Sequence, residues 1–310
     1  MRKFIIRILL FTFPILLMAI IIEILLRQIP NDYLLKKEYL DAHSKELETL
    51  ILGSSHSFYG INPIYFSSNT FNASHISQTL DYDYEILKKY QNNFKRLQNV
   101  ICPISYLTLF TKLESLTDSW RIKNYVIYYD IKLSKSYRHN LEVLSNRFNV
   151  NLKRLVSYYL IGNSNISCTE LGWGTGYKSE KAKDLEETGK KAALRHTGNV
   201  EVYEDNKATL RSIIELCESN SINVILVTLP AFETYRQNLN SGQLKRTVET
   251  ATDFANKYNN CHYLNLLEST EFDAKDFYDA DHLNEIGVEK LSLLLNKAID
   301  KTAGGNPIIK

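Results

Sequence analysis

Residues 49–57 read TLILGSSHS: a short apolar run ends at a glycine and leads into two serines, a histidine and a third serine. An apolar run of this length is typical of a strand buried on both faces of a parallel sheet. Three later segments have the same character, namely 99–102, 223–229 and 262–266. Amphipathic stretches alternate with these runs, so the sequence predicts an α/β fold with a parallel sheet and right-handed crossovers.

Helical spacing of apolar residues within 210–217 and 248–255 predicts helices between the later strands. A last helix is expected after Asn284, whose side chain can cap it. The region of about 111–199 breaks the alternation and is rich in Tyr, Lys, Asn and Ser, which indicates an insertion that can form a lid or substrate wall. Its glycines at 172–176 indicate an ordinary loop, because no strand precedes them and no helix follows.

Composition excludes several classes of protein. The 310 residues include 37 Lys and Arg against 35 Asp and Glu, a net charge of +2. This balance does not indicate the concentrated basic surface that binding to nucleic acid requires. The 20 Tyr and 13 Phe supply apolar area that disfavours disorder. The four cysteines are widely spaced, so neither a metal site nor a cofactor is expected. Three of them, Cys102, Cys217 and Cys261, fall in apolar patterns typical of free core cysteines.

The N-terminal segment concentrates the hydrophobicity. Residues 4–26 are apolar except for Arg7, Thr12 and Glu23. As a helix this segment would be about 35 Å long, against a hydrocarbon core of about 30 Å, so it can span a membrane. The basic residues at positions 2, 3 and 7 favour a cytoplasmic N-terminus and an extracytoplasmic main domain. A cleaved signal peptide is the alternative, but residues 23–28 lack the small residues of a cleavage site, which favours a retained anchor.

These observations give an expected domain organisation. Residues 1–27 form a cytoplasmic stub and transmembrane anchor, 28–46 a polar connector, 47–301 the α/β domain with its insertion, and 302–310 a flexible tail.

Two short segments hold the residue types of a catalytic site. Ser55 follows a predicted buried strand, where active sites of open α/β sheets lie, and 277–284 reads FYDADHLN. His282 has carboxylates one and three residues upstream, which can hold its Nδ1 proton and stabilise its cation while it acts as a base. Each segment also has a structural interpretation, since serines cap helices and acidic residues favour helix starts.

The combination resembles the SGNH or GDSL hydrolase superfamily. Gly53-Ser54-Ser55 is similar to the family's Gly-Asp-Ser block, with Ser54 in place of Asp, and residues 279–282 match its Asp-x-x-His block. The resemblance runs from about Leu47 to Ile299 and implies a flavodoxin-like three-layer fold. It also implies Ser55 as nucleophile, Asp279 as orienting acid and His282 as base, with Asp281 as the alternative acid.

The family's oxyanion blocks are less clear, because Gly-x-Asn-Asp does not occur in the chain. Asn72 and Ser74 stand where the Gly block is expected, and Ser105 and Tyr106 where the Asn block is expected. These departures resemble the divergent, membrane-anchored bacterial branch that serves O-acetylation of exopolysaccharides and D-alanylation of teichoic acids at the cell surface.

The leading hypothesis is therefore extracytoplasmic acyl transfer, with acetyl as the favoured group, to a cell-surface polysaccharide through an acyl-Ser55 intermediate. The resemblance implies a membrane-bound O-acyltransferase as donor partner and a glycan as acceptor. A carbohydrate esterase and a non-catalytic surface or assembly protein of the same fold remain as alternatives. The near-neutral charge favours stacking and hydrogen bonding to hold a sugar. His75, His196 and His262 are isolated in the sequence, which favours structural roles for them.

Overall fold

The computed structural model describes residues 1–303; residues 304–310, most of the expected tail, lie outside the described residues. The helices are α1 (Arg2–Arg27), α2 (Asp32–His43), α3 (Ser55–Gly60), α4 (Leu80–Tyr90), α5 (Ile122–Tyr129), α6 (Glu142–Ser145), α7 (Phe148–Tyr159), α8 (Leu185–Arg195), α9 (Tyr203–Ser219), α10 (Glu233–Arg236), α11 (Ser241–Lys257) and α12 (Glu285–Ala303). Short 3-10 helices lie at Pro63–Tyr65, Thr108–Phe110, Leu113–Ser115, Ser119–Arg121, Tyr137–Asn140, Ser179–Lys181, Val200–Val202 and Ala274–Asp276.

The chain forms two compact units. The first contains residues 1–37 and 117–166, and the second contains 38–116 and 167–310. The middle of the segment expected as an insertion thus groups with the N-terminal helix, whereas residues 167–199 belong to the second unit. The expected polar connector contains α2.

The second unit is built on a five-stranded parallel sheet. Its strands are β1 (Thr49–Ile51), β2 (Thr70–Asn72), β3 (Asn99–Pro103), β4 (Asn223–Thr228) and β5 (Cys261–Asn265), in the order β2-β1-β3-β4-β5. This flavodoxin-like order confirms the predicted fold class. The chain leaves β1 for one neighbour, β2, and then crosses to the other, β3, so a topological switch point lies at the carboxyl end of β1.

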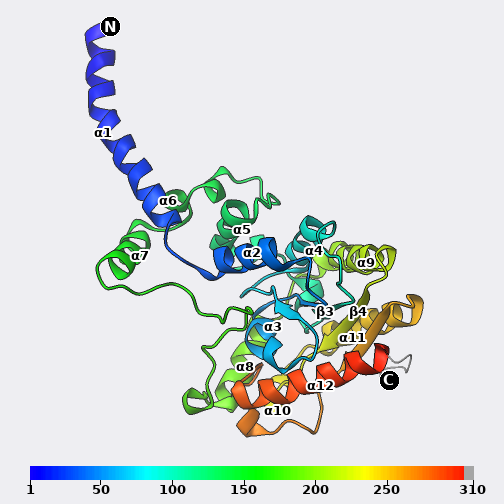
Figure 1. The fold of residues 1–310 in the computed structure, drawn as a ribbon. Coiled ribbons are helices and arrows are strands. Elements are labelled where there is room, and N and C mark those ends of the chain that lie inside the picture. The colour runs from blue at the N-terminus through cyan, green and yellow to red at the C-terminus, as the bar shows by residue number, and fades with distance from the viewer. Residues whose placement is uncertain (304–310) are drawn as a thin grey trace. The chain divides into compact units, whose positions relative to one another are not determined.

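Helices cover both faces of this sheet. Figure 1 shows α4 and α9 on one side and α12 on the other. On the α12 side, Ile51, Ile101 and Ile225 of three neighbouring strands form a core cluster with Leu291 and Leu295 of the helix. Burial of such side chains is worth about 1.5–3 kcal/mol each, so α12 is held firmly against the sheet.

The start of α12 is capped as the sequence predicts. The Asn284 side-chain oxygen accepts hydrogen bonds from the amides of Ile286, at 2.9 Å, and Gly287, at 3.2 Å. Its amide group donates to the carbonyls of Lys275 and Phe277. One side chain therefore joins the helix to a two-stranded hairpin, β6 (Phe277–Asp279) and β7 (His282–Leu283), which carries the Asp-x-x-His segment.

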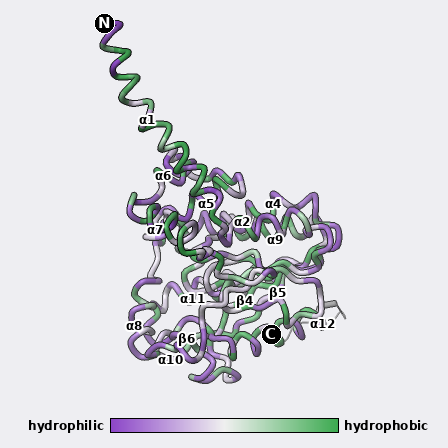
Figure 2. Tube along the Cα trace, turned by 60° about the vertical axis from the view of Figure 1, so that its left-hand side comes forward, coloured by the Kyte–Doolittle hydropathy of each residue, from purple (hydrophilic) through white to green (hydrophobic). Residues whose placement is uncertain are grey.

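The first unit contains the long N-terminal helix. Helix α1 is long and apolar enough to cross a membrane, and no residue of its apolar window is buried. Figure 2 shows the hydrophobic colour along most of its length. Helix α1 contains Pro14, which a membrane helix tolerates.

Candidate active site

A strained turn leads from β1 into the site. Gly53 has φ +108°, and a Cβ atom there would lie 2.6 Å from the Ser57 Oγ atom, so only glycine fits without rearrangement. The amide of Gly53 donates to Asp83 Oδ1 of α4 at 2.8 Å, and its carbonyl accepts from the His75 amide at 3.3 Å. Contacts on both sides therefore hold the turn that precedes Ser55.

Asp83 is a buried acid that serves this turn. Burial raises the pKa of Asp83 to about 7, against the hydrogen bonds from Gln78 and from the Gly53 amide, which favour its charged form. The Gln78 amide donates to the same carboxylate oxygen at 2.6 Å. The carboxyl group thus supplies an acceptor for a backbone amide that would otherwise be buried without one.

Helix α3 begins at Ser55 and is tied to the neighbouring strand. The side-chain amide of Asn72, at the end of β2, donates to the carbonyls of Ser57, at 2.9 Å, and Ile61, at 2.8 Å. The Ser57 carbonyl also accepts from the Ile61 amide at 3.1 Å, so the Asn72 side chain adds a second bond at the C-terminal end of this short helix. The position of Ser55 is thereby set by both β1 and β2.

The structure brings Ser55, His282 and Asp279 together across the domain. Ser55 Oγ lies 2.9 Å from His282 Nε2, and His282 Nδ1 lies 2.9 Å from Asp279 Oδ1. Both distances are within the reach of proton transfer and of an orienting hydrogen bond. The arrangement has the geometry of a nucleophile, a base and an acid that fixes the tautomer of the base.

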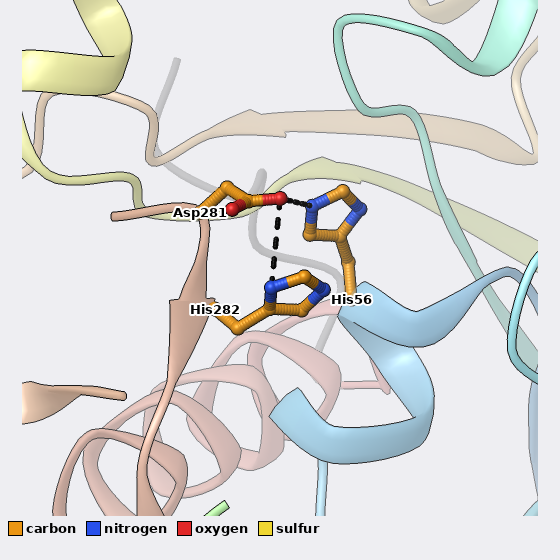
Figure 3. A group of neighbouring side chains, drawn as sticks. All are labelled: His56, Asp281 and His282. Atoms are coloured by element: carbon orange, nitrogen blue, oxygen red, sulfur yellow. Dashed lines mark ion pairs between the residues drawn. The ribbon is translucent and has the colours of Figure 1, made fainter. Parts of the chain in front are cut away.

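Asp281 lies near the same ring nitrogen of His282 and also faces His56 (Figure 3). Its Oδ2 atom is 3.5 Å from His282 Nδ1, 3.4 Å from His56 Nε2 and 3.8 Å from His196 Nδ1. Arg195 Nη2 lies 4.0 Å from the same oxygen. Because Asp281 is only 4% exposed, its charge acts on these groups through protein rather than water. Asp279 is the nearer acid to His282, and Asp281 is a second negative charge beside it.

The two acids determine where the proton of this cluster resides. Burial by itself lowers the pKa of His282, but the charge of Asp281 and the hydrogen bond to Asp279 outweigh it and raise the pKa to about 10. Burial lowers the pKa of His56, and it lowers the pKa of His196 to about 3. Among these three histidines, His282 is therefore the one that binds a proton most strongly.

Aromatic rings limit how the His282 ring can turn. The His56 ring stacks on it with centroids 4.7 Å apart and an interplanar angle of 18°, and Tyr177 meets it edge-on at 5.2 Å. Tyr177 is itself stacked between Tyr59, at 3.7 Å, and Tyr278, at 3.9 Å. These three tyrosines form an aromatic wall beside the base.

The glycine-containing loop at 172–176 positions this wall. The Gly174 amide donates to the Phe58 carbonyl at 2.8 Å, and Trp173 Nε1 donates to the Tyr59 carbonyl at 2.9 Å. A Cβ atom on Gly174 would lie 2.3 Å from the Phe58 ring, so the close approach to α3 requires glycine. The loop interpretation of these glycines is consistent with this packing role, and Tyr177 follows directly after them.

The residues expected to supply oxyanion donors have other partners. The Ser74 amide and hydroxyl both donate to the Asn72 carboxamide oxygen, and the Asn72 amide group holds α3. The Ser105 amide donates to Thr108 Oγ1 at 2.9 Å. The Tyr106 hydroxyl accepts from the Asn240 amide at 3.0 Å. These four residues lie at the same edge of the sheet as Ser55, but their bonds brace the loops.

One group of the described residues has the composition of a metal site. The ligand atoms of His56, Asp281 and His282 lie within 4.8 Å of one another. However, His282 uses Nε2 toward Ser55 and Nδ1 toward Asp279, and a metal would require one of these nitrogens. The donor set therefore fits a proton relay better than a cation site.

Sequence reasoning missed two histidines of this cluster. His196, which directly follows α8, lies 3.8 Å from Asp281 Oδ2 through its Nδ1 atom. The same nitrogen lies 2.9 Å from the Tyr235 hydroxyl, which agrees with the structural role that the sequence favoured for this histidine. His56 follows Ser55 directly, so a polar ring next to the candidate nucleophile was a signal that could have been used.

Several solved structures are similar to this chain. A candidate acylhydrolase from Bacteroides fragilis has 13% identity and a TM-score of 0.42, covering 86% of this chain and 96% of its own. A candidate platelet activating factor from Streptococcus pneumonia has 11% identity and a TM-score of 0.44, covering 86% and 90%. A GDSL-like lipase from Bacteroides thetaiotaomicron has 13% identity and a TM-score of 0.42, covering 87% and 99%. No protein-family model and no curated protein matches the chain.

Proposed function

We propose that this protein is a serine-dependent acyl-transfer enzyme of the SGNH or GDSL type. The observation that carries the proposal is the contact of 2.9 Å between Ser55 Oγ and His282 Nε2, with Asp279 at 2.9 Å from the other ring nitrogen. The residues come from opposite ends of the domain, 227 positions apart. If Ser55 only capped a helix, it would not need to contact His282. If the acidic residues only favoured a helix start, they would not need to hold a histidine against a serine.

In the proposed reaction, His282 Nε2 takes the proton of Ser55 while Oγ attacks the carbonyl carbon of an acyl donor. The new Oγ–C bond forms, the leaving group departs with the proton from His282, and an acyl-Ser55 ester remains. His282 then deprotonates an acceptor hydroxyl, whose oxygen attacks the ester carbon; the C–Oγ bond breaks and His282 returns the proton to Ser55 Oγ. Asp279 holds the Nδ1–H group throughout and stabilises the imidazolium cation.

The developing oxyanion needs a hydrogen-bond donor. Ser55 is the first residue of α3, and an amide at this position has no carbonyl partner within its own helix. We assign the Ser55 amide as the main oxyanion donor, because the amides of Ser74 and Ser105 are already bonded to side chains. An oxyanion site with few donors favours activated acyl donors over stable amides.

A serine-directed fluorophosphonate probe tests the proposal. The wild-type protein should be labelled, and Ser55→Ala and His282→Ala should abolish labelling, because the probe reports an activated serine hydroxyl. Ser54→Ala is the matched control, since it removes the adjacent hydroxyl, which lies 3.4 Å from His56 Nδ1, and should keep the label. Folded wild-type protein without label would contradict both enzymatic interpretations and favour the non-catalytic one.

We further propose that the enzyme works outside the cell membrane, anchored by α1 with its N-terminus in the cytoplasm. The support is the exposed apolar surface of α1 together with the basic residues at positions 2, 3 and 7. An external protease applied to intact bacteria should degrade the second unit and spare a fragment containing α1. Protection of the whole chain would contradict this orientation.

Transfer to a cell-surface polysaccharide is the form of the reaction that membrane anchoring favours. A membrane-bound O-acyltransferase would deliver the acyl group, in our proposal acetyl, and tethering raises the local concentration of both partners. The aromatic wall of Tyr59, Tyr177 and Tyr278 supplies polarisable surface and hydroxyl groups for a sugar. Acetyl transfer from a phenyl acetate to added oligosaccharide, measured against release of acetate to water, distinguishes a transferase from a carbohydrate esterase.

A further inference from the structure

Helix α7 in the first unit is exposed on its apolar side. Phe148 is 73% exposed, Leu152 48%, Val156 37% and Tyr159 43%, and the spacing of these residues places them on one face. Leu160 and Ile161, which follow the helix, are 79% and 65% exposed. We refer to these six residues as the α7 apolar face. Isolated exposed apolar residues are ordinary on protein surfaces, whereas a continuous face of them marks an interaction site.

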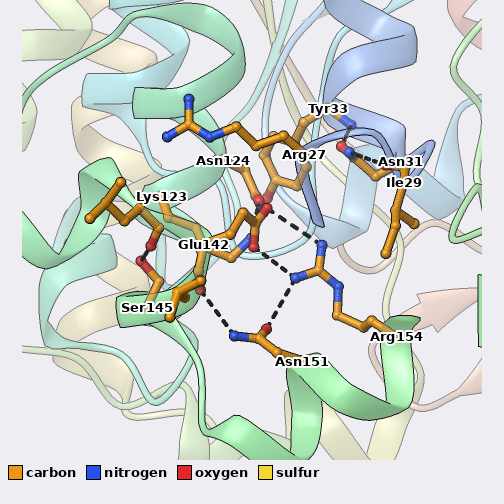
Figure 4. Close-up of polar contacts among 12 residues, drawn as sticks. Arg27, Ile29, Asn31, Tyr33, Lys123, Asn124, Glu142, Ser145, Asn151 and Arg154 are labelled. Carbon is orange, nitrogen blue, oxygen red and sulfur yellow. Dashed lines mark hydrogen bonds and ion pairs between the residues drawn. The ribbon is translucent and has the colours of Figure 1, made fainter. Parts of the chain in front are cut away.

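The buried side of α7 is polar, the reverse of an ordinary surface helix. Asn151 is 3% exposed and donates to the Glu142 carbonyl at 3.2 Å. Arg154 Nη1 lies 2.7 Å from Glu142 Oε2, and Lys123 Nζ lies 2.8 Å from the same oxygen. Figure 4 shows these side chains converging on Glu142. A helix with an ion-paired inner side and an apolar outer side is suited to a surrounding that is itself apolar.

The same unit joins α7 to the C-terminal end of α1. The Tyr159 hydroxyl donates to the Leu25 carbonyl at 3.0 Å. The Glu23 carboxylate accepts from the amides of Glu142, at 3.1 Å, and Val143, at 2.9 Å, at the start of α6. If α1 spans a membrane, its last turns lie at one interface, so the elements bonded to Glu23 and Leu25 lie at that depth.

We propose that the α7 apolar face lies in the headgroup and upper acyl region of the bilayer that α1 spans. The proposal rests on the membrane anchor proposed above. An amphipathic helix can lie in the interface plane with its apolar side buried in lipid, and aromatic residues such as Phe148 and Tyr159 suit this depth.

This contact has a consequence for the enzyme. A single transmembrane helix leaves the adjoining unit free to tilt, whereas a second lipid contact next to its end restricts that tilt. The first unit would then be held at a defined angle to the membrane surface by both α1 and α7.

Fluorescence quenching in full-length protein reconstituted into phosphatidylglycerol and phosphatidylcholine nanodiscs tests the proposal. The Cys168→Ser background leaves Cys102, Cys217 and Cys261, each at most 2% exposed. Single cysteines introduced as Leu16→Cys on α1, Leu152→Cys on the face and Lys153→Cys beside it would carry a bimane label. The Lys153→Cys variant is the matched control. Lys153 is next to Leu152 on the same helix but lies outside the α7 apolar face.

Lipids with a nitroxide near the headgroup should quench the Leu152→Cys label severalfold more than the Lys153→Cys label, and aqueous iodide should show the opposite order. Lipids with a nitroxide near the end of the acyl chain should quench the Leu16→Cys label, because that position lies near the middle of the proposed span. Equal quenching at Leu152 and Lys153, with strong quenching at Leu16, would overturn the α7 proposal and leave the anchor intact. No lipid quenching at Leu16 would overturn the anchor itself. A Leu152 label shielded from both iodide and lipid would instead indicate a protein contact, such as a second copy of this chain, and would overturn the proposal.

Discussion

At the scale of single residues, the two acids beside His282 divide between two tasks. Asp279 accepts the Nδ1 hydrogen bond, and Asp281 adds charge without a comparably short bond to the ring. Asp279→Asn should lower kcat by about 10²- to 10⁴-fold, because loss of the acceptor permits the wrong tautomer of the base. Asp281→Asn should lower kcat less, since the orienting bond remains. Steady-state ester hydrolysis by purified variants measures both, and a larger loss for Asp281→Asn would reverse the assignment.

The pH dependence of the reaction should report the charge of Asp281. The reactive form of His282 is the neutral imidazole, and its pKa is raised to about 10, so the rate should increase with pH as this proton is lost. Asp281→Asn removes a negative charge that stabilises the cation, lowers the pKa of His282 and moves the acidic limb of the profile to lower pH. Glu186→Gln, which removes an exposed charge on α8, should leave the limb in place. A profile unchanged by Asp281→Asn would contradict this coupling.

At the scale of secondary structure elements, the capping of α12 links stability to the site. Asn284 bonds both the start of the helix and the hairpin that carries Asp279 and His282. Asn284→Ala should cost about 1–3 kcal/mol of unfolding free energy and also lower activity, because buried partners lose their bonds. Asn240→Ala, which removes the cap of α11, should cost about 1 kcal/mol with activity retained. Denaturant unfolding and probe labelling measure the two effects, and equal activity losses would contradict the link.

The strands show what local pattern can and cannot predict. The runs at 99–102 and 223–229 correspond to β3 and β4, because a strand buried on both faces has to be apolar throughout. The run at 262–266 corresponds to β5, but β5 is an edge strand whose residues after Cys261 are only partly buried or exposed, so the expected burial on both faces is wrong there. Strand β2 has only three residues, which is too few for a periodic signal. The reversed polarity of α7 could not be predicted, since spacing identifies an apolar face without saying whether protein or lipid covers it.

At the scale of the whole molecule, the first unit contains a buried ionic network and the second contains the candidate active site. Glu142, which is fully buried, lies with Lys123 in the first unit, whereas the Ser55 site lies in the second. Glu142→Gln should destabilise the first unit by about 3–5 kcal/mol, because Lys123 is left as an uncompensated buried charge.

The adjacent Lys123→Met substitution should recover part of this loss in the double variant. The control is Glu187→Gln, whose exposed partner is Lys191, and it should cost less than about 1 kcal/mol. Unfolding measured by circular dichroism supplies the energies, and fluorophosphonate labelling shows whether the second unit stays intact. A loss at Glu142 as small as that at Glu187 would contradict the importance of the buried network.

The sequence by itself determined the α/β class, the apolar N-terminal helix and the two segments that contain Ser55 and His282. These features depend on local periodicity, composition and short spacings, which can be recognised in the sequence alone. Only the tertiary structure decided that Asp281 also faces His56 and His196, that Asn72 braces α3, and that residues 117–166 group with α1. Those relations join residues that are distant in sequence, and they arise from burial and hydrogen bonding that no local pattern records.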